Sequence, residues 1–177
     1  MDTSVLPLII LVPLILGTTL VPALQRISRG MTALGAIGIS LCCFLLLLSQ
    51  TTSVLQGNSL VQHWDWLPQA GIHLSFRLDA LGLMFALLIS GIGTLIMIYA
   101  YYYLSAKNSL AKLYQLLMLF MAAMLGISLS NNLMLLLVFW ELTSISSFLL
   151  VGYWSQYEVA QRGARMALTL TGMGGLA

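Results

Sequence analysis

Ala80–Leu104 has the sequence ALGLMFALLISGIGTLIMIYAYYYL, which contains no charged residue. An α-helix needs about 20 apolar residues to cross the hydrocarbon core of a bilayer, and this run is longer than that. Tyr99, Tyr101, Tyr102 and Tyr103 gather at one end of the run, as tyrosines do at the level of lipid headgroups. The run therefore predicts a transmembrane helix that ends at a membrane interface.

Further apolar runs surround this one. Of all residues 60% are apolar and 7% are charged, whereas soluble domains have about 45–50% apolar and about 25% charged residues. We therefore expect an all-α, polytopic transmembrane helix bundle with about five full spans and the start of a sixth. The expected spans are 5–24, 31–49, 80–104, 113–129 and 133–154, followed by an incomplete span at 166–177.

The incomplete span has a consequence for the length of the protein. At about 1.5 Å per residue, the run 166–177 crosses roughly half a bilayer. Open helix carbonyls are strongly disfavoured in hydrocarbon. We therefore expect residues 1–177 to be the N-terminal part of a single, longer transmembrane domain.

The stretch 50–77 is more polar than its surroundings. Residues 73–77 alternate in polarity, as a short strand does. We predict a loop outside the membrane between the second and third spans, and this loop can hold a small β-hairpin.

Basic residues indicate the orientation, because Lys and Arg favour cytoplasmic loops. Six of the seven fall on alternate loops, so we expect those loops in the cytoplasm and the N-terminus and the hairpin outside. The six are Arg26, Arg29, Lys107, Lys112, Arg162 and Arg165.

Glu141 is the principal candidate for function. It lies about 12 Å from the start of the fifth expected span, near the middle of the bilayer. A charged side chain there costs at least about 2.5–3.5 kcal/mol and often marks an ion path or proton relay. Desolvation disfavours the ionised carboxylate, so such a group can accept and release protons. The structural alternative is a Glu that hydrogen-bonds between helices and fixes their packing.

Hydroxyl residues accompany Glu141 on the same span. At 100° per residue, Thr143, Ser144 and Ser147 fall to one side of Glu141. Their hydroxyls can hold water or bridge to another helix. We treat these three residues as possible secondary members of the same site.

Asp79 stands at the beginning of the third span, two residues after Arg77. A carboxylate is favoured at a helix N-terminus, and it can also pair with Arg77. We therefore expect an anchor at the start of the helix more than a member of an ion path.

Other residue patterns indicate little chemistry. Adjacent Cys42 and Cys43 fit small packing residues, and His63 and His73 have no cysteine cluster beside them. We expect no metal and no cofactor. The net charge of +2 without a basic patch argues against nucleic acid, and no motif of a soluble enzyme is present.

Two motifs carry a family resemblance. The sequence FWELTSISSFLLVGYW at 139–154 resembles the fifth-helix signature of the antiporter-like superfamily. That superfamily includes the large membrane subunits of respiratory complex I and the A-type subunit of Mrp Na⁺/H⁺ antiporters. The sequence WELTS at 140–144, together with FRLDALG at 76–82 and ISGIG at 89–93, is similar to the Mrp version of these segments. The resemblance covers 76–177, and the first two spans only in layout.

The resemblance implies a role for Glu141. In that family the matching Glu is a protonatable member of the ion path and works with a lysine on a later helix. It implies a subunit of a hetero-oligomeric antiporter complex in a bacterial plasma membrane, exchanging Na⁺ for protons. Two alternatives stay open: a proton-pumping subunit of a quinone-linked oxidoreductase or membrane hydrogenase, and a structural membrane subunit.

Overall fold

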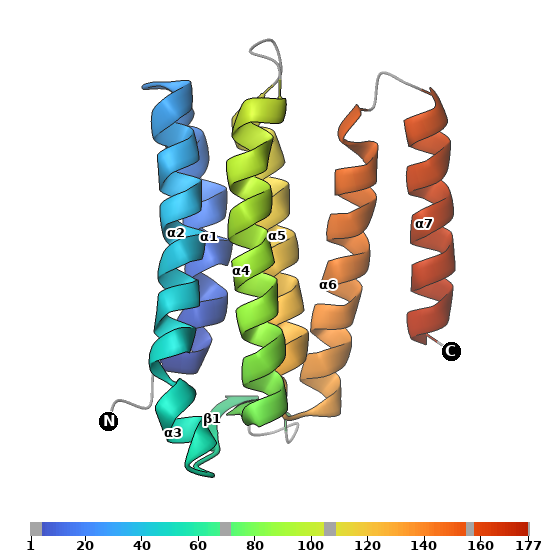
Figure 1. Cartoon of the computed structure of the whole chain (residues 1–177). Helices are drawn as coiled ribbons and strands as arrows, with labels where there is room; N and C mark the ends of the chain where they lie inside the picture. Colours follow the sequence, from blue (N-terminus) through green and yellow to red (C-terminus); the bar gives the residue numbers. More distant parts are fainter. Residues whose placement is uncertain (1–4, 68–71, 105–108, 155–157, 177) are drawn as a thin grey trace.

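A computed structural model describes residues 5–67, 72–104, 109–154 and 158–176. Long helices lie side by side, each antiparallel to the next along the chain, and a small hairpin lies at one end of the bundle (Figure 1). The elements are α1 (Val5–Gln25), α2 (Arg29–Ser49), α3 (Thr51–Leu55), β1 (Leu60–Leu67), β2 (Ile72–Leu78), α4 (Ala80–Tyr103), α5 (Leu110–Leu129), α6 (Leu133–Val151), the 3-10 turn η2 (Gly152–Trp154) and α7 (Glu158–Leu176).

Five helices among the described residues are long and apolar enough to cross a membrane, as the sequence predicted. They occupy Leu6–Gln25, Arg29–Leu55, Ala80–Tyr103, Leu110–Leu129 and Leu133–Trp154. The expected β-hairpin is also present, with β1 and β2 paired antiparallel from Leu60 opposite Leu78 to Leu67 opposite Ile72.

Polar caps set where several helices begin. The side chain of Ser28 accepts a hydrogen bond from the amide of Met31 and starts α2, and Ser109 does the same for Lys112 in α5. Helix α5 therefore begins at Leu110, before the apolar run expected at 113–129, because a capping hydroxyl satisfies amides that the helix leaves open. Residues 51–55, expected in the polar loop, form the short helix α3 instead.

Helix α7 likewise begins earlier than the apolar run at 166–177. It starts at Glu158, and Arg162 and Arg165 lie in its first turns. Arg162 pairs with Glu158 across one turn at 3.4 Å, with both side chains exposed. The apolar run that begins at 166 is thus the second part of a longer helix, and the first turns of this helix are polar.

Helix α5 lies at the centre of the bundle and packs against α1, α4 and α6. Half of its apolar window is buried, the largest share among the five candidate spans. Its side chains Tyr114, Met118, Leu125 and Leu129 are fully buried. Helix α6 packs against α5 on one side and against α7 on the other, and α7 is the outermost helix of the described bundle (Figure 1).

Candidate functional site

Glu141 lies in α6, about 12 Å along the helix from Leu133. Only 17% of the apolar window of this helix is buried, compared with 33–50% for the other four spans. Three side chains beside it are open: Leu137, Val138 and Ile145 are 40%, 55% and 47% exposed, whereas Ser144, one turn further along, is buried. Glu141 therefore lies at the border between an uncovered and a packed side of α6.

The carboxyl group itself is partly withdrawn into the protein. Oxygen Oε1 of Glu141 is buried and has no hydrogen-bond partner among the described residues. A buried polar atom without a partner is costly in an apolar environment. The arrangement gives Glu141 an unsatisfied acceptor, which a water, a proton or a cationic side chain can satisfy.

A hollow of about 550 Å³ opens between α5, α6 and α7, next to this position. The three hydroxyl residues expected beside Glu141, namely Thr143, Ser144 and Ser147, line this one hollow, and Thr171 of α7 joins them. Glu141 is not among the lining residues, although its neighbour Trp140 is. The structure thus brings the hydroxyls together and places Glu141 on the adjacent face of α6.

Three of the four hydroxyls of this hollow donate hydrogen bonds to backbone carbonyls of their own helices. Thr143 donates to the carbonyl of Trp140 at 2.6 Å, and Ser144 to the same carbonyl at 3.3 Å. Thr171 donates to the carbonyl of Ala167 at 2.8 Å. Their remaining lone pairs are acceptors, so these groups suit water or a cation better than an anion.

The sequence analysis did not single out Thr171. The signal that could have found it is the pattern of Thr169 and Thr171 within an otherwise apolar stretch of the sixth helix. Only the packing of α7 against α6 reveals that Thr171, and not Thr169, lines the hollow.

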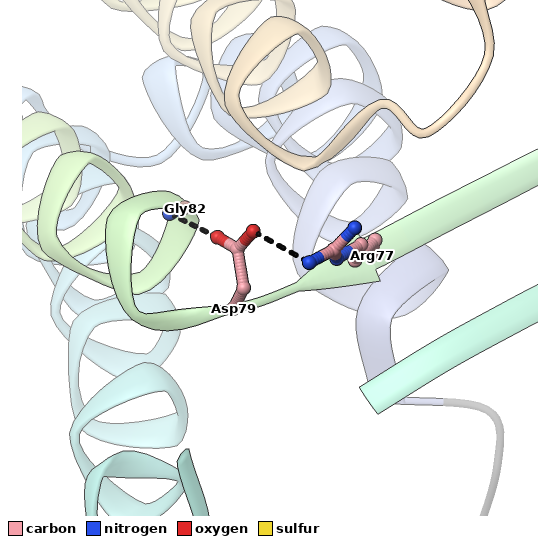
Figure 2. A network of polar contacts seen from close by, with 3 residues as sticks. All are labelled: Arg77, Asp79 and Gly82. Atoms are coloured by element: carbon pink, nitrogen blue, oxygen red, sulfur yellow. Dashed lines mark hydrogen bonds and ion pairs between the residues drawn. The ribbon is translucent and has the colours of Figure 1, made fainter. Parts of the chain in front are cut away.

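Asp79 caps helix α4 and makes both contacts expected of it. Its Oδ1 accepts a hydrogen bond from the amide of Gly82 at 2.8 Å, and its Oδ2 lies 3.3 Å from Nη2 of Arg77 (Figure 2). A Cβ at Gly82 would come within 3.1 Å of the carbonyl oxygen of Ser128. The close approach of α4 to the end of α5 thus depends on a glycine in the turn that Asp79 caps.

The hairpin is tied to the connection between α5 and α6. The amide of Asn131 donates to the carbonyl of Ser75 at 2.9 Å, and its side-chain amide donates to the Ser75 hydroxyl at 3.1 Å. Phe76 and Ser130 form an isolated antiparallel bridge. Asn132, which follows Asn131, caps α6: its side-chain oxygen accepts a hydrogen bond from the amide of Met134 at 2.9 Å. These contacts fix the start of the helix that carries Glu141.

The described residues hold no group of three or more His, Cys, Asp and Glu side chains placed to bind a metal. In the backbone register of the hairpin, His63 lies opposite Ser75 and His73 lies opposite Asp65, so the two histidines are not cross-strand partners. Cys42 is exposed and Cys43 is buried, and both are free thiols.

Two family models match the chain. Residues 66–114 match the N-terminus of chain 5 of NADH-ubiquinone oxidoreductase (complex I), and residues 130–177 match the transmembrane family of NADH:quinone oxidoreductase and Mrp antiporters. Together the two matches span more than half of the chain, including the cap of α4 and all of α6.

Curated relatives are components of antiporters by name. The chain is 45% identical over 150 residues to the A/B subunit of a probable K⁺/H⁺ antiporter of Rhizobium meliloti (strain 1021), covering 85% of this chain and 15% of the relative. It is 39% identical over 175 residues to the A1 subunit of a Na⁺/H⁺ antiporter of Staphylococcus aureus, covering 98% of this chain and 22% of the relative. The chain thus spans under a quarter of the length of these relatives.

Solved structures share the fold. A chain of the Mrp complex from Dietzia sp. DQ12-45-1b superposes with a TM-score of 0.81 at 28% identity, covering 97% of this chain and 18% of that one. A chain of the membrane-bound sulfane sulfur reductase, an archaeal respiratory membrane complex, gives a TM-score of 0.82 at 24% identity, covering 97% and 34%. At that identity the second likeness concerns the fold alone. The predicted resemblance is confirmed: this chain belongs to the family of membrane proteins shared by NADH:quinone oxidoreductases and Mrp antiporters, and it is similar to the A-type subunit of the Mrp complexes.

Proposed function

We propose that this chain is part of a hetero-oligomeric antiporter that exchanges a monovalent cation, Na⁺ or K⁺, for protons. The names of the relatives support the exchange. The observation that carries the proposal is the partly buried carboxyl of Glu141 in a membrane-spanning helix, with one oxygen lacking a partner among the described residues. Apolar helices suffice for a scaffold, so a structural role alone leaves the cost of this carboxyl unexplained.

In this proposal Glu141 takes up and releases the transported proton. Loss of the proton creates a charge within a membrane-spanning helix, and this charge biases nearby water and side chains. The acceptor-lined hollow at Thr143, Ser144 and Ser147 supplies the water that links Glu141 to its surroundings. The exposed face around Glu141 is where further helices of the complex pack, and it is where a cationic partner would approach the carboxyl.

The membrane orientation is part of the proposal. The ends of α1, α4 and α6 and the starts of α2, α5 and α7 lie together at one end of the bundle, opposite the hairpin (Figure 1). The described basic residues of the connecting loops lie at this end, which we assign to the cytoplasm of a bacterium, with the hairpin outside. Single cysteines at the exposed positions Asn58 and Arg162, in a chain lacking Cys42 and Cys43, test this orientation. A membrane-impermeant thiol reagent should label Asn58→Cys in intact cells and Arg162→Cys only in everted vesicles; the reverse pattern would invert the assignment.

The function is tested in everted vesicles from an antiporter-deficient host that expresses the complete complex. Respiration acidifies the vesicles, and addition of Na⁺ or K⁺ should collapse the pH gradient. Glu141→Gln should abolish this collapse while the complex still assembles on a native gel. The matched control is Glu158→Gln, which removes an exposed carboxylate and should leave transport unchanged. Full transport by assembled Glu141→Gln protein contradicts a relay role.

A redox-driven proton pump is the second candidate, because one matching family model describes NADH:quinone oxidoreductases and a respiratory complex shares the fold. Glu141 would have the same role, but electron transfer would supply the energy. If the cation leaves the pH gradient unchanged while an electron donor drives Glu141-dependent proton uptake, this second function replaces the first.

A further inference from the structure

A second hollow, separate from the one near Glu141, lies between α2 and α4. Its volume is about 290 Å³, and it is lined by Gly30, Ala33, Leu34 and Ile37 of α2 and by Ile98, Tyr101 and Tyr102 of α4. These residues belong to the start of α2 and the end of α4, at the end of the bundle opposite the hairpin (Figure 1). The hollow therefore lies close to one membrane interface.

The lining changes in character along the membrane normal. Towards the middle of the bundle it is aliphatic, through Ala33, Ile37 and Ile98. Towards the end it carries the two phenol groups of Tyr101 and Tyr102, side chains that favour the headgroup level. Such a gradient matches one acyl chain with its glycerol ester and headgroup.

The protein leaves room at the interfacial end of this hollow. A Cβ built at Gly30 would meet no atom within 4 Å. The neighbouring side chains Leu34 and Tyr102 are 68% and 80% exposed, so the described residues leave this side of the hollow uncovered.

Positive charge lies beside this end without a compensating carboxylate. Arg29 precedes Gly30; its Nη2 donates to the carbonyl of Leu104 at the end of α4, and its Nη1 is buried and has no hydrogen-bond partner among the described residues. The ion pairs of the described residues are Arg77–Asp79 and Arg162–Glu158, and they leave Arg26, Arg29 and Lys112 unpaired. The uncompensated charge at this end favours an anionic group.

We propose that this hollow binds an anionic phospholipid, with an acyl chain between α2 and α4 and its phosphate beside Arg29. A lipid brings an apolar chain and an anionic group in one molecule, which the aliphatic lining and the adjacent charge require together. A protein helix would need an acidic side chain at one matching position to do the same. The proposal does not depend on the direction or the ion of transport.

The test uses the complete complex in lipid nanodiscs that contain trace phosphatidylglycerol or phosphatidylcholine with a photoreactive group on the acyl chain. Labelled peptides are mapped by mass spectrometry. Phosphatidylglycerol should label the segments 30–37 and 98–102 about fivefold more than phosphatidylcholine does, the ratio expected when one basic side chain contributes about 1 kcal/mol near the membrane surface. Equal labelling by both lipids would refute the anionic preference.

Two glycines of α2 provide matched variants. Gly30→Leu should fill the hollow and reduce labelling at 98–102 to the level of open helix faces. Gly38→Leu adds the same side chain on the same helix, also where a Cβ meets nothing within 4 Å, and should leave labelling unchanged because Gly38 does not line the hollow. Labelling that survives Gly30→Leu, or a cross-link from this hollow to another protein chain, would overturn the proposal.

Arg29→Gln separates the charge from the cavity. It should bring the ratio of phosphatidylglycerol to phosphatidylcholine labelling close to one while phosphatidylcholine labelling persists. Persistent phosphatidylcholine labelling shows that the hollow has kept its shape without the Arg29 contact to Leu104. An unchanged ratio would show that Arg29 does not select the headgroup.

Discussion

The hydroxyl oxygen of Ser40 in α2 lies 2.8 Å from the hydroxyl oxygen of Thr94 in α4. Thr94 donates to the carbonyl of Ser90 at 2.8 Å, and Ser90 donates to the carbonyl of Ala86 at 2.7 Å. All three side chains are buried. With Thr94 donating to its own helix, Ser40 is the donor that joins α2 to α4.

Replacing Ser40 should therefore loosen the contact between α2 and α4. We expect Ser40→Ala to lower the free energy of unfolding by about 0.6–1.7 kcal/mol, the range for hydrogen bonds between membrane helices. Unfolding in mixed detergent micelles measures this value, and Ser49→Ala is the control, since the exposed Ser49 donates only to the carbonyl of Leu46 in its own helix. A double-mutant cycle with Thr94→Val should show coupling of similar size; a coupling near zero would mean that the bond contributes nothing.

Gly126 controls how closely α5 and α6 approach. A Cβ at Gly126 would clash with the ring of Phe139, which fills the space that any side chain would need. Gly126→Ala should destabilise the protein by about 1–3 kcal/mol, the usual cost of overpacking. Thermal unfolding in detergent measures the change.

The control for this substitution is Gly38→Ala, which has open space around its Cβ and should be neutral or slightly stabilising. Removing the ring should relieve the clash. Gly126→Ala should therefore cost less stability when it is added to Phe139→Ala than when it is added to the wild-type protein. If Gly126→Ala costs nothing, the close contact with Phe139 is not what holds α6 in place.

Asp79 should act as a cap and not as an ion ligand. Asp79→Ala removes the bond to the Gly82 amide and should cost about 1 kcal/mol of stability. Asp79→Asn can keep that bond and loses only the half-exposed pair with Arg77, a kind of pair that contributes about 0–1 kcal/mol. Unfolding measurements should therefore show a larger loss of stability for Asp79→Ala than for Asp79→Asn. Antiport should stay intact in Asp79→Asn. Loss of antiport in a stable Asp79→Asn protein would place Asp79 on the ion path.

Ser147 should matter for transport through the hollow that it lines. Ser147→Ala removes one acceptor from the water there and should slow the pH-gradient collapse about fivefold, if one such hydrogen bond contributes about 1 kcal/mol. Ile145→Leu, on the exposed face of the same helix, should leave the rate unchanged. Equal rates in both variants would indicate that the hollow takes no part in proton movement.

The membrane spans could be predicted from sequence because length and lack of charge suffice to identify them. The cap at Asp79 could also be predicted, because its position before the apolar run and its distance from Arg77 determine the contact. The placement of Glu141 beside, and not within, the hydroxyl-lined hollow could not. Nearly every face of α6 is apolar, so the sequence does not indicate which face meets α5 or α7. That rotation depends on contacts such as Phe139 against Gly126, which join residues from different helices.

The bonds between Ser75 and Asn131 have a mechanical consequence. They join strand β2 to the residue just before the cap of α6, so a displacement of the hairpin would be passed to the start of this helix. With the hairpin outside the membrane, as proposed above, an antibody fragment bound to it would act on the helix of Glu141 from the aqueous side. An inhibitor of this kind would need no route to Glu141 through lipid.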